Sequence, residues 1–494
     1  MPRGRASGLK GAGAALALAF TAAPALAQVT AADVWHGWGA ALARVGVTQT
    51  GTTARAGDVM TVTDAGAVIE MPFGRIGWHV GQLALHDDGD GSVRVTLPRG
   101  VPVMLDLDLD LRWHHPRLSL GGELTAEGLD WRYSGTPDDL QGHVAARRLT
   151  FELTAPEGAA AGGGATTGFV VAEDVDRTTR IRLDDVPRLE MQATVGHLTS
   201  EISVRRPQAT TVQRAEYRGI ETAVALRLPE TAPAAPSLSA ALRAGMRLHA
   251  SGRAGELHVR DIDRRGHDTL RDVAQTVQGA RWALDMTRGR GLELALDNRA
   301  GELAFDGAPV ARVAASTLRL RLPLIARSTP QETALVLTVA GIEALGPWAV
   351  AAGDGAAPAH LDLALRGEII LRADLADGRG AAGRPYDLLR LELQRLDAAL
   401  GGAALTGSGA FAWRDGSGAG RHMAMPEGEA TLVAQGVHAL LARVAATGRV
   451  PDLVILSLRG MLAMVGTPTG PDRVEAHLTI DDAGIRINGL ALPF

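Results

Sequence analysis

The stretch that decides the fold is "VMLDLDLDLRWHHP", residues 103–116, in which leucine alternates with aspartate. Successive side chains of a β-strand point to opposite faces of a sheet. On a strand, the leucines would share a dry face, while Asp106, Asp108 and Asp110 would share a wet one. The stretch therefore predicts an antiparallel sheet with one solvated face.

The same stretch holds the strongest candidates for a ligand contact. Asp108, Asp110, His114 and His115 bring carboxylate and imidazole groups close together in the chain, which suits a surface metal or a polar ligand. Carboxylates on one face of a strand lie about 6.6–7 Å apart, an arrangement too linear for a calcium cage. The competing interpretation is a solvated face opposite arginines of a neighbouring strand, such as 316–322, and it requires no metal and no cofactor.

Alternation of this kind recurs along most of the chain. It predicts a mainly β (α+β) protein with large antiparallel sheets, either curved into a groove or packed as sandwiches. Runs of Gly and Asp supply the turns between the strands. The predicted strands are 91–98, 103–113, 180–186, 222–229, 291–298, 316–324, 333–342, 360–375 and 473–480.

Helical spacing interrupts this pattern near both ends and once in between. An N-terminal helix is predicted within 28–47, with Thr30 or Asp33 as its cap. Another helix is predicted near 267–287, and a C-terminal pair over 431–448 and 451–466. The predicted organisation is a β-rich region over 48–229, a Pro/Ala-rich linker over 230–237, a second β-rich region over 238–430, and the helix pair with a closing hairpin over 431–494.

The first 27 residues predict export. Arg3, Arg5 and Lys10 precede an apolar run that ends in Ala25-Leu26-Ala27, the pattern of a cleaved signal peptide. We expect cleavage after Ala27 and a periplasmic mature chain, with an uncleaved membrane anchor as the alternative. No later segment is long and apolar enough to predict a transmembrane helix.

Composition excludes several classes of function. The 494 residues carry a formal net charge of −5, and loss of the three leader charges leaves about −8 (−5 − 3), a poor balance for binding nucleic acid. The chain has no cysteine, and Lys10 is its only lysine, which excludes cysteine nucleophiles, cysteine-based zinc sites and Ser-x-x-Lys catalysis. The histidines are scattered. The sequence therefore favours a non-catalytic role, while loop-borne binding or hydrolase activity on a β-sandwich stays open.

Two tryptophans of the first predicted helix are a second pair of candidates. Trp35 and Trp38 fall on its apolar stripe. They could form an apolar docking surface for a lipid or a protein, or they could pack in the core.

Three segments of the chain resemble a known family. They are "ADVWHGWGAALARVGV" (32–47), "LELQRLDAALGGAALTGSGAFAWRDG" (391–416) and the tail from "GEATLVAQGVHALLARVAATGRVPD" to "INGLALPF". Together with the leader, they are similar to the exported domain-of-unknown-function 2125 family of Gram-negative bacteria. The resemblance implies an envelope protein and supplies no catalytic or binding residues. The alternating strands also look like AsmA-like envelope proteins, a likeness of fold alone.

These observations favour an exported envelope protein that binds a lipid or another envelope protein on an apolar sheet face. Strands with one Leu/Val face form a groove when that face is left uncovered, and few predicted helices are available to cover it.

Overall fold

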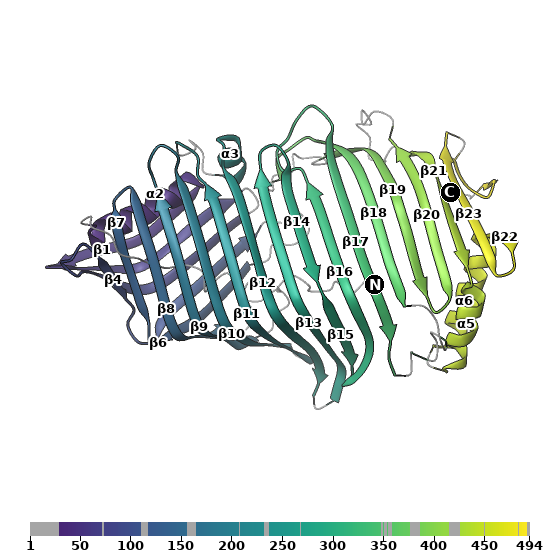
Figure 1. The fold of residues 1–494 in the computed structure, drawn as a ribbon, viewed down its shortest axis with the longest axis horizontal. Coiled ribbons are helices and arrows are strands. Elements are labelled where there is room, and N and C mark those ends of the chain that lie inside the picture. Colours follow the sequence, from purple (N-terminus) through teal and green to yellow (C-terminus); the bar gives the residue numbers. More distant parts are fainter. Residues whose placement is uncertain are drawn as a thin grey trace. The chain divides into compact units, whose positions relative to one another are not determined.

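The computed structural model describes residues 29–71, 74–109, 117–155, 165–206, 208–231, 237–266, 268–346, 349, 353, 358–375, 386–413, 425–448, 450–482 and 484–491. The predicted leader, Asp110, His114 and His115 lie outside these residues. In the described part the chain forms 25 strands and four helices, and the strand pairings are antiparallel (Figure 1). The prediction of a mainly β fold is confirmed.

Contacts divide the chain into two compact units, with the change near residue 272. Unit 1 is built from α2 (Ala31–Arg44), β1 (Val47–Ala56), β2 (Val59–Met71), β3 (Gly74–Asp87), β4 (Val93–Thr96), β5 (Val101–Leu109), β6 (Arg117–Glu127), β7 (Asp130–Thr136), β8 (Asp139–Ala155), β9 (Ala165–Arg182), β10 (Arg188–Arg206), β11 (Ala209–Arg227), α3 (Leu238–Arg243) and β12 (Arg247–Arg265).

Unit 2 takes most of the remaining elements. They are β13 (Asp268–Thr287, shared with unit 1), β14 (Gly291–Asn298), β15 (Ala300–Phe305), β16 (Ala308–Leu322), β17 (Gln331–Ala344), β18 (Ala359–Leu371), β19 (Tyr386–Leu400), β20 (Ala403–Ala412), β21 (Glu427–Gln435), α5 (Val437–Ala446), α6 (Asp452–Val465), β22 (Thr467–Gly470), β23 (Arg473–Asp481), β24 (Gly484–Ile487) and β25 (Leu490–Ala491).

The strands of unit 1 follow one another across the sheet. Strands β1, β2 and β3 form a meander, and β3 then pairs with both β4 and β5. Strands β6 and β7 both pair with β8, and β8 to β12 continue as direct neighbours. The β4–β7 and β5–β6 pairs therefore run side by side between β3 and β8.

Helix α2 fills one end of unit 1. Its start is fixed by a capping box in which Thr30 Oγ1 accepts from the Asp33 amide, while the Asp33 carboxylate accepts from the Thr30 amide at 2.9 Å. The buried face of α2 packs against residues of β2 and β3 and also against residues of β7, β8 and β9 (Figure 1). Unit 1 thus folds around this helix, and the predicted N-terminal helix and its capping residues are confirmed.

A crease crosses β8 to β11 in unit 1, because the alternation of side chains breaks at the same level on each strand. Side chains on one face of a regular strand are an even number of positions apart. Here one apolar cluster contains residues of the same strand that are three positions apart: Ala146 and Leu149, Ala172 and Val175, Val195 and Leu198, and Tyr217 and Ile220. Between them lie Asp174 and Gly219, with φ of 53° and 61°. Such left-handed residues bend a strand as bulges do, and Gly219 adopts this angle without steric cost.

The prediction of a helix near 267–287 is wrong. Residues 268–287 form strand β13, which pairs with β15. Gly279, with φ of 60°, interrupts the alternation of this strand and gives it the irregular spacing of a helix. The β-branched residues Val273, Thr276 and Val277, which precede Gly279, favour the extended backbone.

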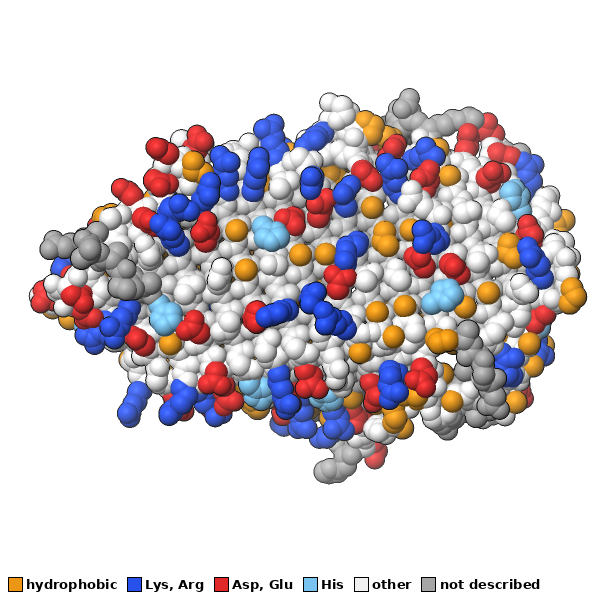
Figure 2. Space-filling model, viewed as in Figure 1, with side chains coloured by type: hydrophobic (Ala, Val, Ile, Leu, Met, Phe, Trp, Pro, Cys, Tyr) orange, Lys and Arg blue, Asp and Glu red, His pale blue; other side chains and the backbone are white. Residues whose placement is uncertain are grey.

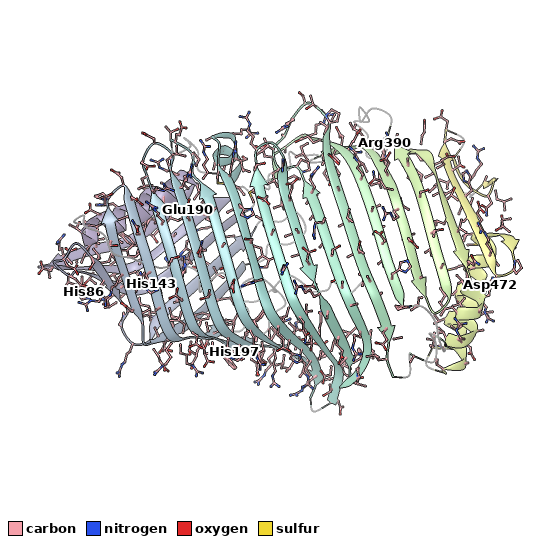
Figure 3. All side chains as sticks on the ribbon, viewed as in Figure 1. His86, His143, Glu190, His197, Arg390 and Asp472 are labelled. Atoms are coloured by element: carbon pink, nitrogen blue, oxygen red, sulfur yellow. The ribbon has the colours of Figure 1, made fainter. Side chains whose placement is uncertain are left out.

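The C-terminal helix pair exists but begins later than predicted. Residues 427–435 form β21, and helix α5 starts only at Val437. The residue before it, Gly436, has no side chain to cap the helix. Asp472 supplies the cap instead, since its carboxylate accepts from the amides of His438 at 2.9 Å and Ala439 at 3.0 Å (Figure 3).

We expect Asp472→Ala to destabilise unit 2 by about 1 kcal/mol, because two amides of the first turn of α5 lose their acceptor. Asp472→Asn should cost less, since its amide oxygen can still accept one of these bonds. Urea unfolding followed by circular dichroism measures both. Equal losses for the two variants would contradict a capping role.

Candidate functional site

The acidic stretch that opened the sequence forms strand β5 over Val101–Leu109. Leu105 packs with Leu120 and Leu153 in an apolar cluster, so the leucine side of this strand is the dry one, as predicted. The register places Asp108 opposite Arg75 of β3 and Arg117 of β6. The prediction of facing arginines holds, but they come from β3 and β6 and not from 316–322.

Several histidines of the described chain lie beside carboxylates of neighbouring strands. His143 lies 2.8 Å from Asp176, and His197 lies 3.0 Å from Glu216. Figure 3 shows His86, His143 and His197 at separate places on unit 1. In the described residues, no three His, Asp or Glu side chains come together as a metal ion would require. These pairs are contacts of a polar sheet face.

A hollow of about 480 Å³ lies over β5, β6 and β8. Its lining includes Glu123 and Glu152, which are opposite each other in the register of β6 and β8. Two facing carboxylates are where a hydrolytic function would be sought first. The hollow is shallow and open, and the two carboxylates are equivalent neighbours on one wet face.

Unit 2 carries an apolar surface that we call the leucine face. Five adjacent strands, β14, β16, β17, β18 and β19, place leucines opposite leucines in two rows. The first row is Leu294, Leu320, Leu335, Leu365 and Leu393, and the second is Leu296, Leu318, Leu337, Leu363 and Leu396. At about 4.8 Å between strands, each row is about 19 Å long.

The opposite face of the same strands is held by ion pairs. Arg319 contacts Asp297 at 2.7 Å, Arg321 contacts Glu293 at 2.9 Å, and Arg395 contacts Asp362 at 2.6 Å. Figure 2 shows such mixed acidic and basic groups on the surface of the strands. Exposed pairs add little stability each, about 0–1 kcal/mol. Their alternation with leucine nevertheless fixes which face of each strand is dry.

The leucine face is incompletely covered within the described residues. Its ten leucines are all partly exposed, whereas core leucines of unit 1 such as Leu85 and Leu140 are 0% exposed. In the described part, the extensive contacts of these five strands are made with neighbouring strands. Contiguous apolar surface of this kind is uncommon on a monomer without a binding role.

Helix α6 is a second apolar surface of unit 2. Leu453, Leu456 and Met464 are 74%, 67% and 71% exposed, and Ile455 is the buried residue of the helix. No described helix is both long and apolar enough to span a membrane.

The two tryptophans of α2 lie in or beside the apolar core of unit 1. Trp38 is 9% exposed and lies in the core, stacked on Trp131 at 6.1 Å between ring centroids, and Trp35 packs against the edge of the same cluster. Trp38 is thus a core residue. The prediction that it forms a docking surface is wrong, and the alternative prediction of core packing is right. Of the four candidate polar residues, Asp108 alone lies in the described part of the chain, and only its position in β5 is described.

A family model described as "Uncharacterized protein conserved in bacteria (DUF2125)" matches residues 265–493. Residues 265–493, a little under half of the chain, are thus similar to that family. The matched residues include the leucine face, α5 and α6. Searches of curated proteins and of solved structures gave no match.

Proposed function

We propose that this DUF2125 protein is an exported, non-catalytic envelope protein that binds lipid acyl chains on its leucine face. The observation that carries the proposal is the pair of leucine rows, in register over five strands and only partly buried. Acyl chains gain about 0.8 kcal/mol for each CH₂ group that leaves water. An apolar face about 19 Å long offers this gain without specific polar contacts.

The amino-terminal sequence supports the cellular location in this proposal. The basic residues, the apolar run and Ala25-Leu26-Ala27 have the order of a cleaved signal peptide. The pairing of one charged face with one leucine face suits a protein that works in water and carries an apolar ligand.

We expect Leu320→Glu to weaken binding of the apolar dye N-phenyl-1-naphthylamine at least about tenfold, because it places a charge within the first leucine row. Fluorescence titration of the purified, delipidated protein measures the affinity. Circular dichroism checks that the variant folds.

Ala334→Glu is the matched control. Ala334 lies on the polar face of β17, opposite Arg321 of β16 and Arg366 of β18, where a new carboxylate is well accommodated. This variant should bind the dye as the natural protein does. Full dye affinity in Leu320→Glu would rule out the leucine face, and loss of affinity in both variants would indicate a nonspecific effect of charge.

A protein partner is the second candidate, favoured by α6. Its exposed leucines and methionines resemble the anchors of a helix that docks in a groove. Mass spectrometry of material co-purified with the protein separates the two functions, since the first predicts lipid and the second a stoichiometric protein.

A further inference from the structure

Arg177 of β9 points into the core of unit 1. The neighbouring inward residues of its strand, Val175 and Ile181, both belong to apolar clusters. Arg177 itself is 6% exposed, and its Nε and Nη1 groups have no hydrogen-bond partner within the protein. A guanidinium donates up to five hydrogen bonds, and leaving donors buried without acceptors costs about 1–3 kcal/mol each.

The electrostatic surroundings of Arg177 are also incomplete. Burial lowers the pKa of Arg177 to about 10, and the hydroxyl of Tyr133 opposes this shift. No carboxylate is among the causes within the described chain. The nearby ion pair of Arg180 and Asp139, at 2.5 Å on the polar face, shows the usual arrangement that Arg177 lacks. Buried charges in proteins are normally paired.

Two threonine hydroxyls on the same inward face also lack hydrogen-bond partners. The register places Ala193 beside Arg177, Thr222 beside Ala193 and Gly252 beside Thr222. Thr179 is two residues along β9 from Arg177. The hydroxyl groups of Thr179 and Thr222 are buried and lack hydrogen-bond partners in the structure.

The residues that follow Arg177 across the neighbouring strands are small. Ala193, Thr222 and Gly252 form a path of short side chains from Arg177 across β10 and β11 to β12. Ala193 is buried, while Thr222 and Gly252 are partly exposed, so exposure increases along this row away from Arg177. Val144 on the other side of Arg177 is apolar and buried.

We propose that Arg177 binds the anionic head of an amphiphile, a carboxylate or a phosphate, inside unit 1. The guanidinium fork matches both groups in geometry and charge. Thr179 and Thr222 would donate hydroxyl hydrogen bonds to the same head, and the apolar clusters around Arg177 would enclose the first part of the chain. This site is independent of the leucine face, since it lies in another unit and depends on charge.

The test compares four probes on the delipidated full chain: laurate, dodecyl phosphate, 1-dodecanol and inorganic phosphate. Calorimetry and the fluorescence of the nearby Trp131 report binding. The two amphiphilic anions should bind about 10- to 100-fold more tightly than 1-dodecanol, the ratio expected for hydrogen bonds to a charged group. Inorganic phosphate should bind much more weakly than dodecyl phosphate.

Arg177→Met should abolish this preference for anions, and Thr222→Val should reduce it about 3- to 10-fold. Arg180→Met is the matched control on the polar face of the same strand and should leave it unchanged. Leu320→Glu should also leave it unchanged, which separates this site from the leucine face.

Four results would overturn the proposal. The first is equal affinity for laurate and 1-dodecanol, and the second is an anion preference that survives Arg177→Met in a folded protein. The third is phosphate binding as tight as that of dodecyl phosphate, which would assign the site to a free anion. Absence of binding by every anion would leave water as the partner of Arg177 and would also refute it.

Discussion

Replacing Trp131 by alanine should destabilise unit 1 by about 3–5 kcal/mol, the loss expected for a buried aromatic residue. Trp131 is 2% exposed and stacks on Trp38 of α2 with an interplanar angle of 17°. Trp38 also meets Tyr133 edge to face at 5.3 Å. Such aromatic pairs add about 0.5–1.5 kcal/mol beyond the area they bury. The substitution removes the contact that joins α2 to β7, so we expect the helix to loosen with it.

Urea unfolding monitored by circular dichroism measures this loss. Trp131→Phe keeps part of the stack and should lose less than half as much stability. Tyr386→Ala serves as the control for removing an aromatic ring from the surface, because Tyr386 is 46% exposed, and it should change stability by less than about 0.5 kcal/mol. A cost below about 1 kcal/mol for Trp131→Ala would mean that α2 is held by other contacts.

The strands were predictable because leucine and charge alternate with period two. Residues 291–298 were predicted as a strand and form β14 with the same bounds. Where the alternation is interrupted, prediction from sequence fails. Gly279 made β13 look helical, and the crease at Asp174 and Gly219 reverses the inward parity of their strands, which a strict period cannot represent.

Long-range contacts account for the misplaced start of α5. A helix start is normally recognised by a capping residue just before it, but Gly436 occupies that position. The cap comes from Asp472, which follows α6 and β22 in the chain. The local sequence therefore carries no signal for the boundary between β21 and α5.

The leucine face and Arg177 were predictable to different degrees. Alternation predicts that each strand of unit 2 has a leucine side, but only the register shows that these sides form two continuous rows. Arg177 lies in "DRTTRIR", where Arg177, Arg180 and Arg182 look alike. Its inward position follows from Val175 and Ile181 on the same side, so strand parity was the signal that could have identified it.

Replacing Arg177 by methionine should stabilise the ligand-free protein at pH 7 by about 1–3 kcal/mol, since an apolar side chain removes a buried guanidinium whose Nε and Nη1 groups have no hydrogen-bond partner. A pKa of about 10 in the folded protein corresponds to roughly 3 kcal/mol against the charged form. This pKa lies below that of the unfolded chain, so the unfolded state holds the proton more tightly. The cost is therefore present at neutral pH and declines as pH rises above about 10.

The stability that Arg177→Met gains over the natural chain should depend on whether an anion is bound. In delipidated protein, Arg177→Met should unfold at a higher temperature than the natural chain in differential scanning calorimetry. With saturating laurate, the natural chain should recover the difference, because the bound carboxylate supplies the missing partner and stabilises only the folded state. Arg180→Met, which breaks the exposed pair with Asp139, should instead cost up to about 1 kcal/mol in both conditions. Destabilisation by Arg177→Met in the absence of any ligand would show that the guanidinium already has its partners inside unit 1.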